Sequence, residues 1–227
     1  MSAPLGRSHG GLGRDVLSCF SGAPLGARAH VRGRWVSCPF RAVVAHLPAQ
    51  GRVLEIGCGH GLFALAAALD RPGRRVVRGI DVDGAKISHG CVAAARAAEL
   101  GGDCSLEAAE PGALPEGPWD AIAIVDVLYL LDADTQRSVL AHAAEVLAPR
   151  GVLLVKEVDI VPRWKFRWNV LQETMSVRVL GITAGAELTF LGASGLGAPM
   201  EGAGLSVQHL PLGRGYPHPH HLIVGRK

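Results

Sequence analysis

The sequence has no CxxC pair, and its five cysteines do not have the spacing of zinc ligands. An odd number of unpaired cysteines favours reduced thiols and a cytoplasmic protein. The N-terminus lacks the apolar segment of a secretory signal. The longest apolar runs, at residues 62–69 and 121–131, are too short or too interrupted to span a bilayer. We therefore expect neither export nor a membrane-spanning segment.

The sequence also lacks a large excess of either charge, because its formal net charge is only +3. This value does not by itself indicate nucleic-acid binding, and no basic and aromatic cluster suggests it. What is present is a globular composition, with 48% hydrophobic and 19% charged residues. A chain of 227 residues buries enough surface to need no disulfide or metal for its stability.

Short apolar strands alternate with helical segments from residue 52 onward. We expect strands at 53–56, 76–80, 105–109, 121–125 and 152–155, and helices at 61–69, 84–100 and about 133–147. Such alternation predicts a parallel sheet with right-handed crossovers. Two further strands, at 205–210 and 221–224, are joined by a loop too short for a helical crossover and should pair antiparallel.

Three segments fall outside this pattern. Residues 1–47 are expected to form a flexible start, to about residue 26, and then a helical cap that Pro39 interrupts. A single α/β domain is expected to fill 48–227. Residues 192–204 are rich in glycine and contain Pro199, so we expect a short or poorly formed helix there.

A Trp- and Arg-rich helical insertion is expected within that domain, at about 160–185. Trp164 and Trp168 are one helical turn apart and share a face with Leu171. Such a helix can pack in the core, cover an apolar acceptor, form a dimer face or lie on a membrane through residues 162–180. The oligomeric state is left open.

The stretch VLEIGCGHG at residues 53–61 runs from a strand through three glycines into a helix. Glycine permits positive φ and lets a ligand lie against bare backbone, and the helix start presents free N–H groups. Leu62 stands where a dinucleotide loop has its third glycine, and Glu55 would repel a pyrophosphate. An NAD(P)-dependent oxidoreductase is therefore disfavoured. A cofactor with an ammonium group and no phosphate fits this loop better than a dinucleotide does. It also fits better than the remaining alternative, a glycine-rich turn that binds no ligand.

Two acids follow the next two strands. Asp81 can accept both hydroxyls of a ribose, and the alternative, a helix cap, suits Asp83 better. Glu110 is placed to hold an adenine amino group or is a solvated loop acid.

These motifs together resemble class I S-adenosylmethionine-dependent methyltransferases. Residues 53–61 are similar to motif I, 79–83 to the acidic second-strand motif, 118–129 to the fourth-strand motif and 147–153 to the turn into the fifth strand. The resemblance covers about 52–157. It implies a three-layer Rossmann-like α/β fold with a seven-stranded, mostly parallel sheet whose last strand is antiparallel. The cofactor-binding residues that it implies for S-adenosylmethionine are Glu55, Gly57, Cys58, Gly59, Gly61, Asp81, Val82, Ala109, Glu110 and Asp126.

The implied reaction is methyl transfer to a small-molecule acceptor, which we expect to be apolar or lipid-like and to carry a hydroxyl. In-line displacement at a sulfonium mainly requires alignment, and a base is needed only if the acceptor loses a proton. Our candidates for catalysis are Tyr129, Glu157, His218 and His220. The alternative for Glu157 is a surface salt bridge with Lys156. A non-catalytic binding subunit with the same fold is the alternative for the whole chain.

The close histidines in the last loop also invite a metal interpretation. His218, His220 and His221 lie within four positions of one another. The intervening prolines hold them extended and no partner acid is evident, so no metal site is predicted. His60, inside the glycine loop, is expected to shape that loop.

Overall fold

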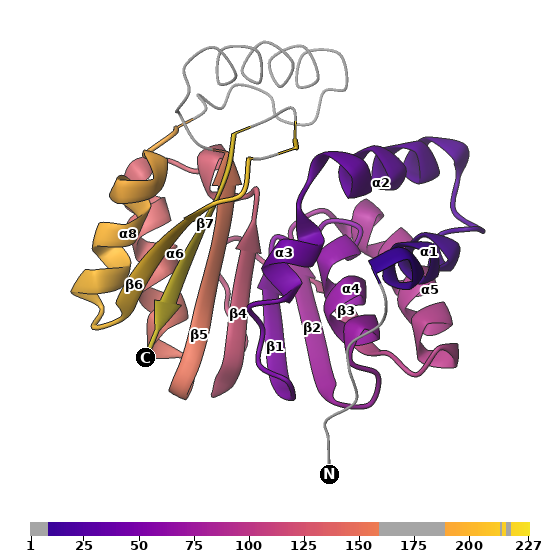
Figure 1. Cartoon of the computed structure of the whole chain (residues 1–227), viewed down its shortest axis with the longest axis horizontal. Helices are drawn as coiled ribbons and strands as arrows, with labels where there is room; N and C mark the ends of the chain where they lie inside the picture. Colours follow the sequence, from indigo (N-terminus) through magenta and orange to yellow (C-terminus); the bar gives the residue numbers. More distant parts are fainter. Residues whose placement is uncertain (1–8, 159–188, 214, 217–218) are drawn as a thin grey trace.

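The computed structural model describes residues 9–213, except 159–188, together with 215–216 and 219–227 (Figure 1). Within these residues seven strands form one sheet in the order β3-β2-β1-β4-β5-β7-β6. The strands are β1 (Gly51–Ile56), β2 (Arg75–Asp81), β3 (Asp103–Ala108), β4 (Trp119–Val125), β5 (Leu147–Val158), β6 (Ser206–Pro211) and β7 (His220–Arg226).

The pairings confirm the predicted sheet. All pairings among β1 to β5 are parallel, and β7 runs antiparallel to both β5 and β6. The carboxyl ends of six strands therefore meet at one edge, which we call the carboxyl edge. In open α/β sheets this edge is where ligands bind.

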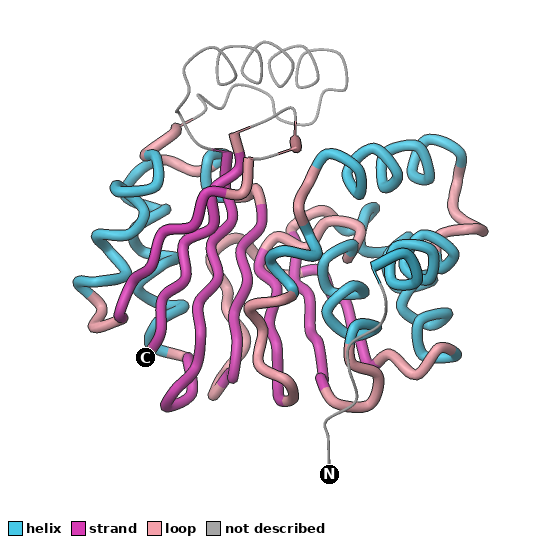
Figure 2. The backbone as a smooth tube through the Cα atoms, in the orientation of Figure 1, coloured by secondary structure: helices cyan, strands magenta, loops and turns pink. Residues whose placement is uncertain are grey.

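Helices cover both faces of the sheet, as Figure 2 shows. One face is covered by α1 (His9–Cys19), α3 (Phe40–Val44), α4 (Leu62–Asp70) and α5 (Gly84–Glu99). The other face is covered by α6 (Ala133–Glu145) and α8 (Gly192–Gly202). Beyond the carboxyl edge lie α2 (Leu25–Ser37) and the short 3-10 turn η1 (Leu128–Leu130). Among the described residues, every helix is too short or too polar to cross a bilayer.

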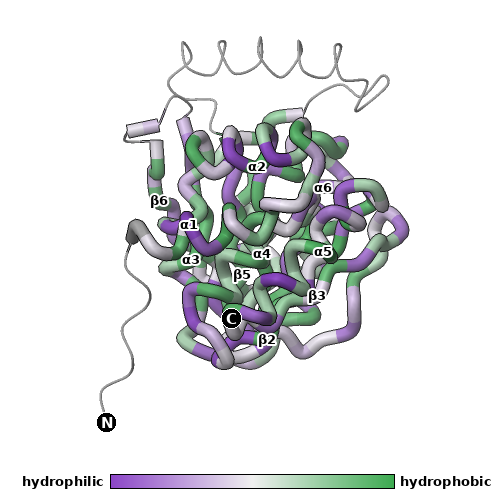
Figure 3. The backbone as a smooth tube through the Cα atoms, turned by 90° about the vertical axis from the view of Figure 1, so that its right-hand side faces the viewer, coloured by the Kyte–Doolittle hydropathy of each residue, from purple (hydrophilic) through white to green (hydrophobic). Residues whose placement is uncertain are grey.

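Helix α4 follows the glycine loop and is the most apolar helix of its face. Every residue from 62 to 69 is buried, which confirms the predicted buried helix. The helix is enclosed because α1, α3 and α5 pack around it while it lies on the sheet (Figure 3). The loop that precedes α4 is therefore held against a rigid support.

The expectation of a flexible start is wrong for the described part of the N-terminus. Residues 9–19 form α1, whose Leu12 and Val16 are buried together with Phe20 just after it. Their spacing of four places them on one helical face, which packs against α4 and α5. The glycines of this segment concealed the helical pattern. Residues 1–8 lie outside the described residues.

Two boundaries also differ from expectation. Strand β5 begins at Leu147, five residues early, because a bulge with Arg150 at φ +68° carries the chain past Pro149. Helix α8 forms over 11 residues despite Pro199. Its Leu196 and Met200 are buried, so packing compensates for the weak helix formers in its sequence.

The segment expected to form a helical cap contains α2 and α3, with Pro39 between them. The Trp- and Arg-rich insertion at 160–185 and the membrane contact expected at 162–180 lie outside the described residues.

Candidate cofactor and acceptor site

The glycine loop turns sharply between β1 and α4. Gly57 and Gly59 have φ values of +73° and +54°, which side chains rarely adopt. A Cβ atom at Gly57 would lie 2.3 Å from Cγ2 of Val127. At Gly59 the nearest atom to such a Cβ would be Cδ of Lys86, 3.7 Å away. Gly57 is therefore required by packing, whereas the outer side of Gly59 is open for a ligand to approach.

Asp81 ends β2 directly beside this loop. Its Oδ2 accepts a hydrogen bond from the Gly59 amide at 2.7 Å, and its Oδ1 accepts one from the Asp83 amide at 2.8 Å. Asp83, as predicted, caps α5 by accepting from the amides of Ala85 and Lys86. The backbone bonds fix the Asp81 carboxylate, which keeps further lone pairs for hydroxyl donors.

Glu55 lies behind the loop on the α4 side. It is buried, and its Oε2 accepts a hydrogen bond from the Ala64 amide at 2.9 Å. Burial raises the pKa of Glu55 to about 8. The carboxyl group thus ties the end of β1 to the first turn of α4. Its predicted contact with the methionine end of a cofactor stays a prediction.

The other predicted cofactor residues surround Asp81 and the loop. Val82 is 67% exposed, although it is a large apolar side chain next to Asp81. The Ala109 amide donates to the Asp81 carbonyl at 3.0 Å, and Glu110 is exposed. Cys58 is buried, and burial raises the pKa of its thiol. Val82, Ala109 and Glu110 therefore form a rim beside Asp81.

Asp126 follows β4 and is the centre of a buried ion cluster. Lys156 Nζ lies 2.5 Å from its Oδ1 and 2.7 Å from its Oδ2, and Arg34 Nη2 lies 2.8 Å from Oδ2. Burial alone would raise the pKa of Asp126, but Lys156 and Arg34 hold it well below its usual range. Burial alone would lower the pKa of Arg34, but the nearby carboxylate of Asp126 raises it above its usual value. We call Arg34, Asp126 and Lys156 the ion triad.

The sequence did not predict that Asp126 pairs with Arg34 and Lys156. Lys156 is fully buried and pairs with Asp126, so the surface salt bridge to Glu157 is wrong. Arg34 was not among the predicted site residues. A signal for it exists, since α2 contains three arginines and no acid, and a partly buried cation needs a partner from elsewhere in the chain.

Glu157 lies on the other side of the sheet from the triad lysine. Its Oε1 accepts hydrogen bonds from the amides of Val127, at 3.0 Å, and Leu128, at 2.8 Å. Its Oε2 is buried and has no hydrogen-bond partner among the described residues. Burial, with a smaller contribution from Asp126, raises the pKa of Glu157 to about 8.

Tyr129 lies in η1, the turn that Glu157 supports. Its ring stacks on Phe190, with the ring centroids 5.4 Å apart and the planes inclined by 6°. The Thr189 amide also donates to the Tyr129 carbonyl at 3.0 Å. Glu157 and Tyr129 are therefore joined through η1 at the carboxyl edge.

His220 begins β7 and contacts the end of α2. The ring is buried, and its Nε2 lies 2.7 Å from the carbonyl oxygen of Ser37. It links β7 to the end of α2, and its catalytic role stays a prediction. His218 lies outside the described residues, and in the part described no group of three metal-ligating side chains converges.

His60 lies in a row of three imidazoles. Its ring centroid is 5.2 Å from that of His30 on α2 and 5.9 Å from that of His89 on α5. Burial and the neighbouring His30 lower the pKa of His60 to about 4. The neutral ring thus connects the glycine loop to both helices.

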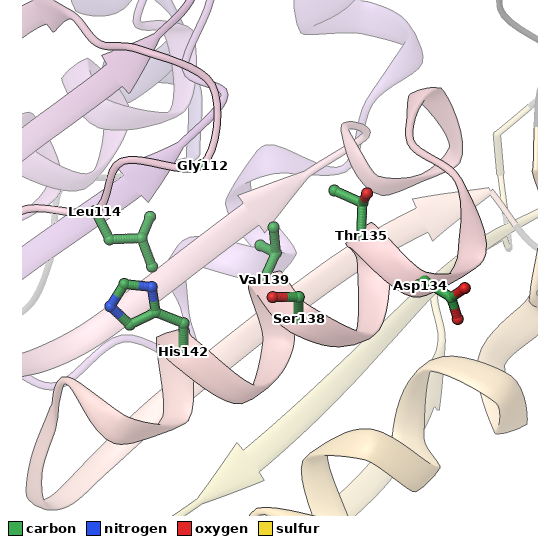
Figure 4. Close-up of a pocket in the computed structure, with 7 residues that line it drawn as sticks. All are labelled: Gly112, Leu114, Asp134, Thr135, Ser138, Val139 and His142. Atoms are coloured by element: carbon green, nitrogen blue, oxygen red, sulfur yellow. The ribbon is translucent and has the colours of Figure 1, made fainter.

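A separate cavity of about 340 Å³ lies between α6 and the loop after β3 (Figure 4). Its lining residues are Gly112, Leu114, Asp134, Thr135, Ser138, Val139 and His142. None of these belongs to the predicted cofactor or catalytic set.

Comparison with known proteins agrees with this geometry. A family model described as a methyltransferase domain matches residues 29–210, which is more than half of the chain. No protein of curated function matches the sequence.

Solved structures with the same fold include methyltransferase family proteins and a cyclase. An O-methyltransferase family protein from Burkholderia thailandensis has a TM-score of 0.66 and 21% identity; the match covers 88% of this chain and only 58% of that one. Magnesium protoporphyrin IX methyltransferase from Synechocystis PCC 6803, with bound SAH, has a TM-score of 0.63 and 18% identity, with 96% and 95% covered. The [4+2]-cyclase SpnF has a TM-score of 0.62 and 16% identity, with 83% and 80% covered.

The sequence identity to each of these structures is below 25%, so the similarity shows the fold alone. The family-model match and the motifs around Gly59 and Asp81 carry the assignment further. The chain belongs to the class I S-adenosylmethionine-dependent methyltransferase superfamily.

Proposed function

We propose that the protein binds S-adenosylmethionine and transfers its methyl group to a small apolar or lipid-like acceptor that carries a hydroxyl. We place the reaction in the cytoplasm, in keeping with five cysteines that are all free thiols. The contact between the Gly59 amide and the Asp81 carboxylate carries the proposal, because it brings the open bend of the loop and the ribose-binding acid together.

The residues present fit this cofactor. The open side of Gly59 leaves room for a ligand against the backbone, and the fixed carboxylate of Asp81 can accept two hydroxyls. The exposed apolar side chain of Val82 suits one face of an adenine ring. The ion triad would hold the methionine end, because its two cations and one acid leave a net positive charge that can attract a carboxylate.

The acceptor would lie over η1. When bound, S-adenosylmethionine supplies an electrophilic methyl group on its sulfonium. The stacked rings of Tyr129 and Phe190 would offer the acceptor a flat apolar surface, and Glu157 Oε2 is the candidate base for the acceptor hydroxyl. With a pKa of about 8, Glu157 holds a proton near neutrality and can take up the acceptor proton only after it has ionised.

Asp81 provides the test of cofactor binding. We expect wild-type protein to bind S-adenosylmethionine in calorimetry. Asp81→Ala should weaken binding by about 1.5–3 kcal/mol for each lost charge-assisted hydrogen bond. Asp81→Asn, which keeps one acceptor, should lose less.

Asp103→Ala is the matched control, since Asp103 is an exposed acid at the opposite end of the neighbouring strand. It should bind as wild type does. Absence of wild-type binding at millimolar ligand would overturn the proposal.

A non-catalytic or cyclase-like role is the second candidate. Two observations favour it, because each engages an acid that could otherwise act as a base. The cations of the triad pair with Asp126, and backbone amides donate to one oxygen of Glu157. The likeness to SpnF adds to it. Release of S-adenosylhomocysteine with a panel of apolar alcohols and phenols separates the two, because only methyl transfer consumes the cofactor.

A further inference from the structure

Helix α2 has a bare face that points away from the molecule. Leu25 and Val36 are 79% and 75% exposed, the highest values among the exposed large apolar side chains of the described residues. Ala29 and Arg32, also exposed, complete the same helical stripe at spacings of three and four. An added Cβ at Gly33 would meet no atom within 4 Å. No described element therefore covers this face, which we call the outer face of α2.

The opposite side of α2 fixes this orientation. Val31 is buried, and Arg34 reaches inward to Asp126. The ring of His30 packs beside His60 of the glycine loop. The helix is thus attached beyond the carboxyl edge (Figure 1), and its outer face is exposed to solvent.

The charge of α2 is of one sign. The helix contains Arg28, Arg32 and Arg34 and no acid, and the hydrophilic stretches along it are visible in Figure 3. Arg34 is paired with Asp126, whereas Arg28 and Arg32 form no ion pair with the described residues. The outer face therefore combines separated apolar side chains with uncompensated positive charge.

We propose that the outer face of α2, formed by Leu25, Ala29, Arg32 and Val36 with the half-exposed Arg28 at its edge, docks on an anionic lipid bilayer. Basic residues beside exposed apolar side chains are typical of helices that lie in a membrane interface. A symmetric contact with a second copy would place arginines against arginines, which is unfavourable. Docking would hold the carboxyl edge near the bilayer, and it does not depend on methyl transfer.

The test is co-sedimentation of the full chain with vesicles of phosphatidylcholine alone and with 30% phosphatidylserine. We expect binding to the anionic vesicles only, and its loss in high salt. Arg28→Gln/Arg32→Gln should weaken binding about 30-fold, at about five-fold for each basic residue near the surface. The double variant Leu25→Ser/Val36→Ser should also lose most of its binding to the anionic vesicles.

Arg74→Gln/Val92→Ser is the matched control, because it removes one exposed arginine and one exposed apolar side chain elsewhere. It should bind as wild type does. No binding to anionic vesicles, or binding that both α2 variants retain, would overturn the proposal. A concentration-dependent dimer that Leu25→Ser/Val36→Ser abolishes would assign the face to a second copy instead.

Cofactor calorimetry on the same proteins keeps the two proposals apart. Protein that binds vesicles but not S-adenosylmethionine contradicts only the proposed function. Protein that binds S-adenosylmethionine but no vesicles contradicts only the docking of α2.

Discussion

At the scale of single residues, the site is defined by where side chains are lacking. Gly57 and Gly73 have similar positive φ values, +73° and +66°. They differ in their surroundings, because a Cβ at Gly57 would meet Val127 at 2.3 Å whereas one at Gly73 would meet nothing within 4 Å. Comparing the two separates backbone strain from steric clash.

We expect Gly57→Ala to destabilise the fold by about 2–4 kcal/mol, as left-handed strain and overpacking add. It should also weaken S-adenosylmethionine binding by moving the loop. Gly73→Ala should cost only about 1 kcal/mol and leave binding unchanged. Urea unfolding and calorimetry measure both quantities. Val127→Ala added to Gly57→Ala should restore part of the stability, and equal losses for the two single variants would contradict the packing argument.

At the scale of elements, the alternation of strands and helices was predictable because the central strands have apolar runs and two of the helices begin at side-chain caps. Asp83 and Asp132 cap α5 and α6. Helix α8 and the start of β5 were not predictable, since burial of Leu196 and a bulge at Arg150 decide them.

The candidate site was predictable only where both partners of a contact lie in recognisable motifs at the ends of neighbouring strands. The loop around Gly59 and Asp81 meets these terms, because adjacent parallel strands bring their ends together. The ion triad does not. Arg34 and Asp126 are 92 residues apart, and no local pattern joins α2 to β4.

The triad leads to a prediction about how α2, β4 and β5 are joined. Asp126→Ala leaves the fully buried Lys156 unpaired and should lower the free energy of unfolding by about 3–5 kcal/mol. Asp126→Leu/Lys156→Met replaces both charges by apolar groups and should recover most of that loss. Arg34→Met should cost less, because this side chain is 34% exposed. Urea unfolding measures all three, and a double variant as unstable as Asp126→Ala would contradict the assignment.

At the scale of the whole molecule, buried ionisable groups make stability depend on pH in opposite directions. His60, with a pKa lowered to about 4, contributes stability that is present above its ordinary pKa and is lost as pH falls from about 6.5. Asp126 acts in the same direction at still lower pH. Glu55 and Glu157, each with a pKa raised to about 8, keep protons in the folded state that the unfolded chain releases above about pH 4.5. Their effect therefore has the opposite sign.

The free energy of unfolding should consequently fall between pH 6.5 and 8, where the two glutamates outweigh the histidines with lowered pKa values, His30, His46 and His60. The slope is at most about 1.4 kcal/mol per pH unit for each of them. Glu55→Gln/Glu157→Gln should flatten this region, since an amide oxygen still accepts from Ala64 and Leu128 but releases no proton. Glu99→Gln, at an exposed position of α5, is the control and should keep the wild-type slope. Urea unfolding at several pH values checks this, and a wild-type protein equally stable at pH 6.5 and 8 would show that neither carboxyl group is held protonated by burial.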